Sequence, residues 1–198
     1  MLLPAALSPL VPAPLYLPYC LALLALARRR LDRRGEVEGV PVYELAGGGA
    51  HDAIGIGLGN GGLILASRAA MADAAWPGLR AHLASHVRRR DGLRVSFVIT
   101  TSVLLAAWQP WVLVPGALWL AWTARDAERH ADLAAARAVR HDGDALAAFA
   151  RYAAIDGARG RSLPFRWTLE GLRALRLSSH PRPELRRENF LRMASTAA

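Results

Sequence analysis

Two long apolar stretches dominate the pattern of hydrophobic and polar positions. The first covers residues 2–27, carries no charge, and is followed at once by the arginine-rich run 28–34. Five prolines between residues 4 and 18 make its first half a poor helix, so the pattern predicts a regular helix over 15–27. A signal peptide carries its positive charge before the apolar stretch, not after it. We therefore predict an uncleaved membrane anchor over residues 1–34 with a cytoplasmic basic flank, and a peripheral hydrophobic arm is the alternative.

The second stretch, residues 95–124, also lacks any charged side chain. One continuous helix of this length would measure about 45 Å, more than the ~30 Å hydrocarbon core of a bilayer. Gln109-Pro110 and Pro115-Gly116 interrupt its middle. The pattern predicts two short arms, 95–108 and 116–124, each about 14–20 Å long. Arms of that length favour a buried or re-entrant hairpin over two full spans.

The segment between the two stretches has strand character. Residues 40–45 predict one strand. Residues 53–62 predict a second strand that leads into a glycine turn, and residues 63–67 predict a third strand. Gly57, Gly59 and Gly62 spell G-x-G-x-x-G, the dinucleotide-binding fingerprint. That fingerprint requires a helix directly after it, whereas a strand-like apolar run follows here. The glycines therefore favour a hairpin turn.

The rest of the chain is predicted to be helical. A short helical link covers 67–75, and a helix beginning near Pro77 runs to about Arg90 and ends at Asp91-Gly92. Further helices are predicted over 125–141, 145–155 and 168–176, with a loop at 157–160 and a short final helix. The fold class is thus α+β and mostly helical, with residues 35–198 forming one domain into which the hairpin 95–124 is inserted.

Composition supports membrane contact and narrows the choice of partners. Apolar residues make up 53% of the 198, the formal net charge is +9, and all 25 basic residues are arginines. Arginines beside apolar segments are typical of cytoplasmic membrane flanks. No aromatic pattern is interleaved with the basic residues, so nucleic acid is not an expected partner. The single cysteine, Cys20, excludes an internal disulfide and a multi-cysteine metal site.

The candidate chemistry lies on the helix that begins near Pro77. His82 and His86 are four residues apart, which places both imidazoles on one face, where they can share a metal ion. The known version of this arrangement is H-E-x-x-H, with two zinc ligands and a general-base glutamate. Leu83 stands at the glutamate position here. A chance pair of histidines at helical spacing is the alternative.

Three separated segments resemble the HtpX-type membrane zinc metalloproteases, the group that includes the CAAX prenyl endopeptidases. The first joins the strands at 53–67 to Ala81-His-Leu-Ala-Ser-His-Val-Arg-Arg-Arg-Asp91. The second is Glu128-Arg-His-Ala-Asp132, similar to the family's E-x-x-A-D after a hydrophobic hairpin. The third is Ser179-His180-Pro181, with arginines five and six residues beyond the proline. The resemblance covers roughly residues 36–192.

This resemblance implies a zincin-like core with zinc bound by His82, His86 and Glu128. Two imidazoles and a carboxylate leave a fourth position open, as catalytic zinc sites do. Asp132 would then orient a ligating histidine. His180 is a candidate accessory residue near the site, and an ordinary turn histidine is the alternative. The hairpin returns Glu128 to the side of the basic flanks, which places the site on the cytoplasmic side of the cell membrane.

Leu83 is the departure from the family that matters for chemistry. Loss of a general base typically lowers the rate of hydrolysis 10²–10⁴-fold. We therefore expect a zinc-binding, metalloendopeptidase-like protein with impaired catalysis, whose partners are membrane lipid and membrane polypeptides. One alternative is an active endopeptidase with a recruited base, on which the substrate adds as a strand beside residues 62–67. Another is a metal-free basic protein of the membrane surface.

Overall fold

The structure is a computed structural model that describes residues 13–46, 52–57, 61–159 and 183–196. It is mostly helical and contains one small sheet, so the α+β class is confirmed. Its elements, in chain order, are α2 (Ala13–Arg30), β1 (Arg33–Val37), β2 (Val40–Leu45), β3 (Ala53–Ile56), β4 (Leu63–Ser67), α3 (Arg68–Ala72), α4 (Trp76–Arg89), α5 (Asp91–Trp108), η2 (Pro110–Val112), α6 (Leu113–Val139), α7 (Gly143–Arg159) and α9 (Pro183–Thr196).

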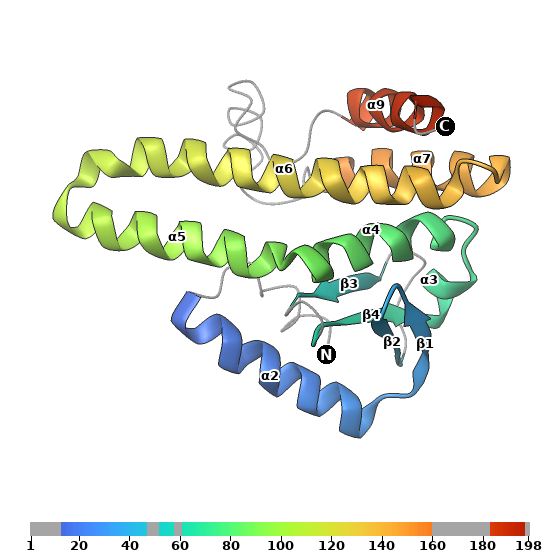
Figure 1. Cartoon of the computed structure of the whole chain (residues 1–198), viewed down its shortest axis with the longest axis horizontal. Coiled ribbons are helices and arrows are strands. Elements are labelled where there is room, and N and C mark those ends of the chain that lie inside the picture. The colour runs from blue at the N-terminus through green and yellow to red at the C-terminus, as the bar shows by residue number, and fades with distance from the viewer. Residues whose placement is uncertain (1–12, 47–51, 58–60, 160–182, 197–198) are drawn as a thin grey trace.

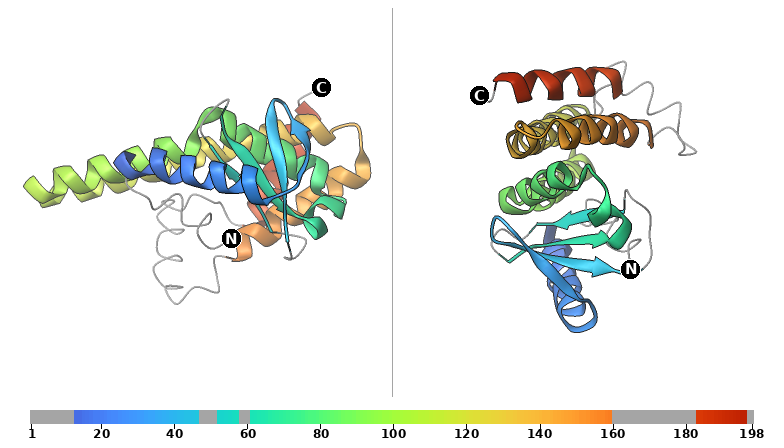
Figure 2. Two further views of the ribbon diagram at one scale, coloured as in Figure 1. Left: turned by 90° about the horizontal axis from the view of Figure 1, so that it is seen from below. Right: turned by 90° about the vertical axis from the view of Figure 1, so that its right-hand side faces the viewer.

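The elements are stacked in layers (Figures 1 and 2). Helix α2 covers one face of the sheet and α4 covers the other; α6 and α7 lie beyond α4, and α9 is outermost. All five residues of the central strand β4 are buried, because helices cover both faces of the sheet. Leu63 and Leu65 point toward α2, whereas Ile64 belongs to the core that contains α4. A strand buried on both faces reads as a continuous apolar run, as Leu63-Ile-Leu-Ala66 does.

The sheet has the strand order β1-β2-β4-β3. Strands β1 and β2 pair antiparallel, β2 and β4 pair parallel, and β3 and β4 pair antiparallel, as predicted for a hairpin. The strand β1 was not predicted, because its residues are mostly exposed at the sheet edge and show no apolar alternation. The prediction that a substrate strand adds beside residues 62–67 is wrong, because β2 and β3 already occupy both edges of β4. The unpaired edge on that side of the described sheet is the outer edge of β3.

Helix α2 confirms the helix predicted within the first apolar stretch. Its buried side chains, Cys20, Leu23, Leu24 and Ala27, pack against the sheet, whereas Leu15, Leu21 and Leu26 are exposed. Packing within the molecule therefore explains the apolar side chains on one face of α2. The structure does not test the predicted anchoring in a membrane, and residues 1–12 lie outside the described part of the chain.

Helices α5 and α6 form the predicted hydrophobic hairpin, and the turn η2 joins them (Figure 1). Gly116 packs closely on Ser102 across the hairpin, and the rings of Phe97 and Trp119 meet edge to face, with centroids 6.4 Å apart. The predicted arms were too short. Pro115 lies in the first turn of α6, where a proline removes no helical hydrogen bond, so it does not interrupt the helix.

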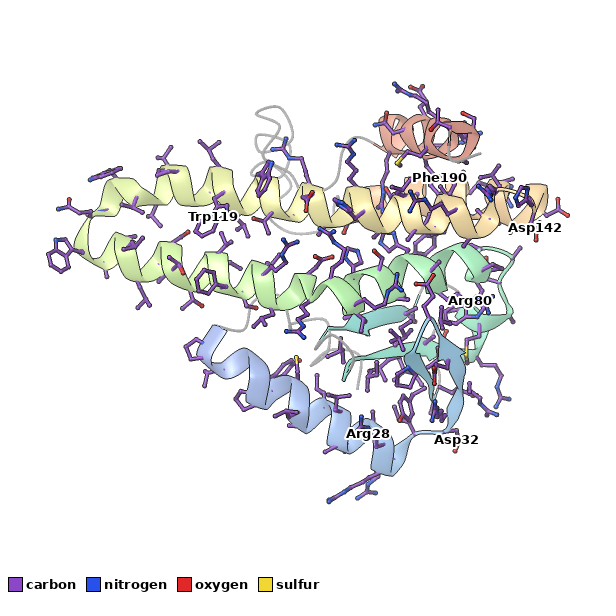
Figure 3. All side chains as sticks on the ribbon, viewed as in Figure 1. Arg28, Asp32, Arg80, Trp119, Asp142 and Phe190 are labelled. Carbon is purple, nitrogen blue, oxygen red and sulfur yellow. The ribbon has the colours of Figure 1, made fainter. Side chains whose placement is uncertain are left out.

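Helix α5 alone measures about 27 Å. Within the described residues, it is the one helix long and apolar enough to cross a membrane, judged by length and composition. The core helix of a soluble protein meets the same test when it is mostly buried, but only 22% of α5 is buried. Figure 3 shows side chains projecting outward from both helices of the hairpin.

Two other helices differ from the prediction. The predicted end of the histidine helix at Asp91-Gly92 is wrong, because α4 ends at Arg89 and Asp91 already opens α5. Helix α7 runs from Gly143 to Arg159 and includes the first residues of the predicted loop at 157–160. Asp142 caps its start by accepting a hydrogen bond from the Ala145 amide. The predicted helix 168–176 lies outside the described residues.

Candidate metal centre

The two histidines project from α4 toward α6, away from the sheet. Pro77 occupies the first turn of α4, and Leu79, Leu83 and Val87 belong to the core that this helix shares with the sheet. The His82 and His86 ring centroids lie 4.7 Å apart, as the spacing of one helical turn requires. His82 is buried and His86 is partly exposed, so the pair is reachable from one side.

Helix α6 completes the cluster from across the α4–α6 interface. Glu128 places one carboxylate oxygen 3.8 Å from His82 Nε2 and the other 3.6 Å from His86 Nε2, and the two Nε2 atoms are 3.1 Å apart. Each of the three residues offers one ligand atom, and these atoms all lie within 4.8 Å of one another. The structure therefore brings together the three ligands expected from the sequence.

Each histidine has its own carboxylate at the other ring nitrogen. Asp91 Oδ2 lies 2.9 Å from His86 Nδ1, and Asp132 Oδ1 lies 3.1 Å from His82 Nδ1 in a less well aligned contact. Asp91 reaches His86 because Arg90 adopts a left-handed conformation (φ 56°) that separates α4 from α5 by a single residue. A carboxylate that accepts a hydrogen bond from Nδ1–H orients the ring and leaves Nε2 free to ligate.

The two Nε2 lone pairs consequently converge on one region beside Glu128. Two lone pairs only 3.1 Å apart repel each other unless a proton or a metal ion lies between them. Burial acts to lower the pKa of His86, but the Asp91 hydrogen bond and the charges of Glu128, Asp91 and Asp132 outweigh it, so the pKa is raised. Without a metal, the surrounding carboxylates therefore favour the protonated form of His86.

Arg186 on α9 balances the negative charge of the cluster. Its guanidinium donates to both oxygens of Asp132, at 3.1 and 2.9 Å, and to Glu128 Oε2 at 3.0 Å, and its side chain is only 2% exposed. Burial acts to raise the pKa of Asp132, but hydrogen bonds from His82 and Arg186 outweigh it and lower the pKa. Asp132 is therefore held ionised, in position to orient His82.

Sequence reasoning missed Asp91 and Arg186 as residues of the site. Asp91 was visible as the acidic residue that follows the arginines after His86, and Arg186 as one of the arginines after Ser179-His180-Pro181. The sequence does not show which side chain either residue contacts. Residues 160–182 lie outside the described structure, so the position of His180 is not part of this geometry.

The donor set fits a tetrahedrally coordinated metal. In a tetrahedral zinc site with bonds of about 2.1 Å to nitrogen and oxygen, neighbouring ligand atoms lie roughly 3.4 Å apart. In this structure the two Nε2 atoms are 3.1 Å apart, His86 Nε2 lies 3.6 Å from one Glu128 oxygen, and His82 Nε2 lies 3.8 Å from the other. One ligand atom from each residue lies within 4.8 Å of the other two, which is close enough for the three to hold a metal ion. Two imidazoles and one carboxylate leave a fourth position for water or substrate. A divalent ion held in this way can polarise a carbonyl group and activate water.

Leu83 lies next to the cluster but belongs to the core. It is three residues before His86, so it occupies the neighbouring ridge of α4. Its side chain is 9% exposed and packs with the apolar residues between α4 and the sheet. Leucine offers no group that accepts or donates a proton, so this position contributes packing and no acid–base chemistry.

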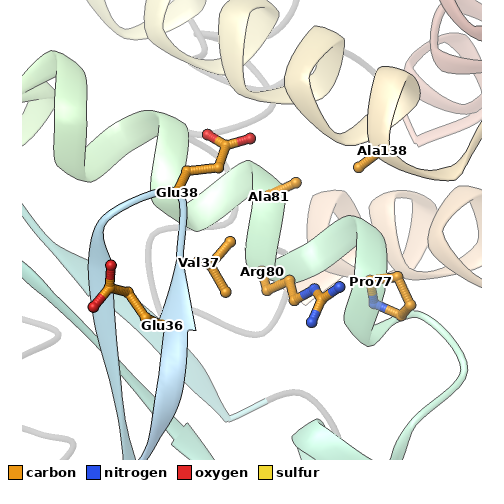
Figure 4. Close-up of a pocket in the computed structure, with 7 residues that line it drawn as sticks. All are labelled: Glu36, Val37, Glu38, Pro77, Arg80, Ala81 and Ala138. Atoms are coloured by element: carbon orange, nitrogen blue, oxygen red, sulfur yellow. The ribbon is translucent and has the colours of Figure 1, made fainter.

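A surface pocket lies near the start of α4, between this helix and the β1–β2 turn (Figure 4). It is lined by Glu36, Val37, Glu38, Pro77, Arg80, Ala81 and Ala138. None of the three candidate ligands lines it, and its lining mixes acidic and basic side chains. The candidate chemistry is therefore in the α4–α6 interface rather than in this pocket.

No protein-family model, curated protein or solved structure matches this chain.

Proposed function

We propose that this chain is a membrane-associated, zinc-binding protein of the metalloendopeptidase type whose capacity to hydrolyse peptides is impaired. His82, His86 and Glu128 would hold the metal, and Asp91 and Asp132 would orient the two histidines. When bound, zinc would supply a polarised water and a Lewis acid for a peptide carbonyl. The resemblance to the HtpX-type proteases in three segments agrees with this assignment.

One observation carries the proposal: two buried or half-buried histidines each face a separate carboxylate through Nδ1 and point Nε2 at a third ligand. A solvated helix face would not require an aspartate for each imidazole. The same carboxylate–histidine arrangement supports metal sites in general. A divalent ion would add to the positive charge that Arg186 places beside Glu128 and Asp132, and Asp91 also lies within ion-pair distance of Arg89 and Arg94.

The expected impairment has two causes. Leu83 stands at the general-base position, and the acidic side chains near the histidines already make other contacts. A general base must reach the metal-bound water, and Leu83 cannot serve. Among the described residues, the acidic neighbours of the histidines are the candidate ligand Glu128 together with Asp91 and Asp132, and these two aspartates already contact a histidine ring. We expect at most a residual hydrolytic rate.

Among the described residues, no strand pairs with the outer edge of β3, and this edge supports a retained capacity to hold polypeptide. A Cβ atom added at Gly55 would lie 3.0 Å from the Leu83 carbonyl oxygen, and one at Gly57 would lie 3.2 Å from the His86 carbonyl oxygen. Strand β3 therefore packs against the turn of α4 that carries the cluster. An extended segment that paired with the outer edge of β3 would run beside this turn, as in β-strand addition.

The first test is the zinc content of detergent-purified protein, with His86→Ala beside wild type. We expect about one zinc per wild-type chain and little or none in the variant. His141→Ala is the matched control, because His141 is exposed and remote from the cluster. Wild-type protein without zinc would contradict the proposal and favour a metal-free protein of the membrane surface.

The second test is Leu83→Glu, assayed for cleavage of unstructured polypeptides in detergent. If the missing base is the cause of impairment, the variant should gain activity that His86→Ala abolishes. A similar rate in wild type and Leu83→Glu, lost in both with His86→Ala, would instead show an active enzyme with a recruited base. Burial of the new carboxylate costs stability, so folding of the variant must be checked by its zinc content and unfolding curve.

A further inference from the structure

The end of the α5–α6 hairpin carries the largest exposed apolar surface of the described chain. It projects beyond the rest of the molecule (Figure 1). Its exposed side chains range from 42% for Trp119 to 84% for Trp108, and they are Phe97, Val103, Leu104, Leu105, Trp108, Trp111, Leu113, Val114, Leu118, Trp119 and Trp122. Soluble monomers rarely expose an apolar surface of this kind without a partner.

The exposed positions surround the hairpin rather than line one side of it. Val103, Leu104 and Leu105 are consecutive and all exposed, as are Ala117, Leu118 and Trp119. Three consecutive helical residues span about 200° around the axis. A docked protein usually covers one face of a helix, whereas lipid surrounds it, and helices that are apolar all round are typical of membranes.

Charge limits the depth to which this surface can be buried. The side chains of Arg94 and Arg125 flank the uncharged residues 95–124 at the same end of the hairpin. Trp108 lies fourteen residues after Arg94, a rise of about 21 Å, and Leu113 lies twelve residues before Arg125, about 18 Å. Both distances exceed half of a ~30 Å hydrocarbon core and fall short of its full thickness.

We propose that this hairpin end enters a lipid bilayer from one side, with Arg94 and Arg125 at the headgroups and the tip at Trp108 and Trp111 near the bilayer centre. The arginines pair with anionic headgroups. This inference sharpens the membrane association in the proposed function and does not depend on the metal. It also replaces the full span permitted by the length of α5 with a monotopic insertion.

The insertion places the metal cluster beside the headgroups. Asp91 is three residues before Arg94 on α5, and Glu128 is three residues after Arg125 on α6, each a rise of about 5 Å. Arg89 and Asp126, joined at 2.7 Å, connect α4 to the same level of α6. A polypeptide that reaches the cluster would therefore be a segment next to the membrane surface, such as the flank of an anchored protein.

Depth-dependent quenching of tryptophan fluorescence tests the proposal. Variants that keep one tryptophan, with phenylalanine at the other positions, are reconstituted into phosphatidylcholine–phosphatidylglycerol vesicles with bromines at defined acyl depths. Deep bromines should quench Trp108 most, Trp119 less and Trp122 least, whereas shallow bromines should favour Trp122. Trp76, on α4 and away from the hairpin, is the control and should remain unquenched. Measurement in EDTA keeps this result separate from metal binding.

Replacing apolar hairpin residues with aspartate is an independent test of the insertion. Leu104→Asp and Leu118→Asp should each reduce binding to these vesicles at least tenfold, because a charged side chain inside the bilayer is strongly unfavourable. Ala147→Asp, an exposed position on α7, should have no effect. Equal quenching of Trp108 and Trp122, or a Trp108 shielded from all bromines in a dimer of this chain, would overturn the proposal.

Discussion

The two halves of the continuous helix α6 pack in different ways. Its first half, up to Trp122, exposes large apolar side chains, and Trp122 itself is 66% exposed. Its second half buries small ones, with Ala131, Ala135 and Ala136 fully buried against neighbouring helices. Small side chains allow α4 and α9 to approach closely enough for Glu128 and Asp132 to reach His82 and Arg186.

The comparison shows that apolar content alone does not identify the core of this chain. The hairpin is rich in leucine and tryptophan yet exposed, whereas the interior around the cluster is built from alanine and paired charges. The two regions should therefore respond to different changes. Loss of a charge should damage the metal-site region, and the hairpin should tolerate internal changes that the metal-site region does not.

The largest effect should come from Asp132→Ala, which removes two of the hydrogen bonds of the buried Arg186 guanidinium. Breaking a buried ion pair by removing one partner typically costs about 3–5 kcal/mol, because the remaining charge is left uncompensated. The free energy of unfolding in urea, measured in EDTA, should fall by about that amount. The double variant Asp132→Ala/Arg186→Met should recover part of the loss, and a double variant less stable than the single one would contradict this account.

Gly78→Ala should also strongly destabilise the metal-site region. A Cβ at Gly78 would lie 2.7 Å from the Phe149 ring, which is fully buried and packs on Phe190 with centroids 4.9 Å apart. The ring has no room to move, so we expect a loss of about 2–3 kcal/mol from overpacking. Thermal unfolding measures it, and an unchanged midpoint would show that this interior adapts.

Gly116→Ala applies the same change to the hairpin and should cost less, about 1 kcal/mol. The added Cβ would meet the Ser102 side chain, 2.5 Å from its oxygen and 2.7 Å from its Cβ. Ser102 is partly exposed, so the two helices can separate slightly at this point. When Ser102 is first replaced by glycine, Gly116→Ala should cause little further loss, because the side chain that the new Cβ would meet is absent. A larger loss than for Gly78→Ala would reverse the comparison between the two regions.

The sequence could predict the features that depend on local spacing. His82 and His86 are one turn apart on a helix whatever surrounds it, and Pro110 identified the hairpin turn. Features that depend on tertiary pairing were harder to predict. The mostly exposed strand β1 carries no apolar alternation, the central place of β4 is set by its partners, and Arg186 contacts Asp132 across 54 positions of sequence. Pro115 was misjudged because a proline in a first turn ends no helix.

The smallest expected effect is on the pH dependence of stability in the metal-free protein. It distinguishes the raised pKa of His86 from the lowered pKa of Asp132. The pKa of His86 is raised above 6.5, so its protonated form adds stability that is fully present below pH 6.5 and is lost as the pH rises through the raised value. The pKa of Asp132 is lowered below 3.8, so its contribution is present above pH 3.8 and is lost as the pH falls through the lowered value.

The unfolding midpoint in EDTA should therefore be highest between about pH 4 and 6.5 and should decline on both sides. Asp91→Asn removes the charge and weakens the hydrogen bond that help to raise the His86 pKa, while Glu128 and Asp132 keep their charges, so the decline on the alkaline side should become smaller. Asp144→Asn, at an exposed position on α7, should leave the profile unchanged. Zinc should remove the alkaline decline in wild type, because a metal that replaces the proton on His86 binds more tightly as the pH rises. An alkaline decline of unchanged size in Asp91→Asn would mean that another group controls it, and the link between Asp91 and His86 would lose its support.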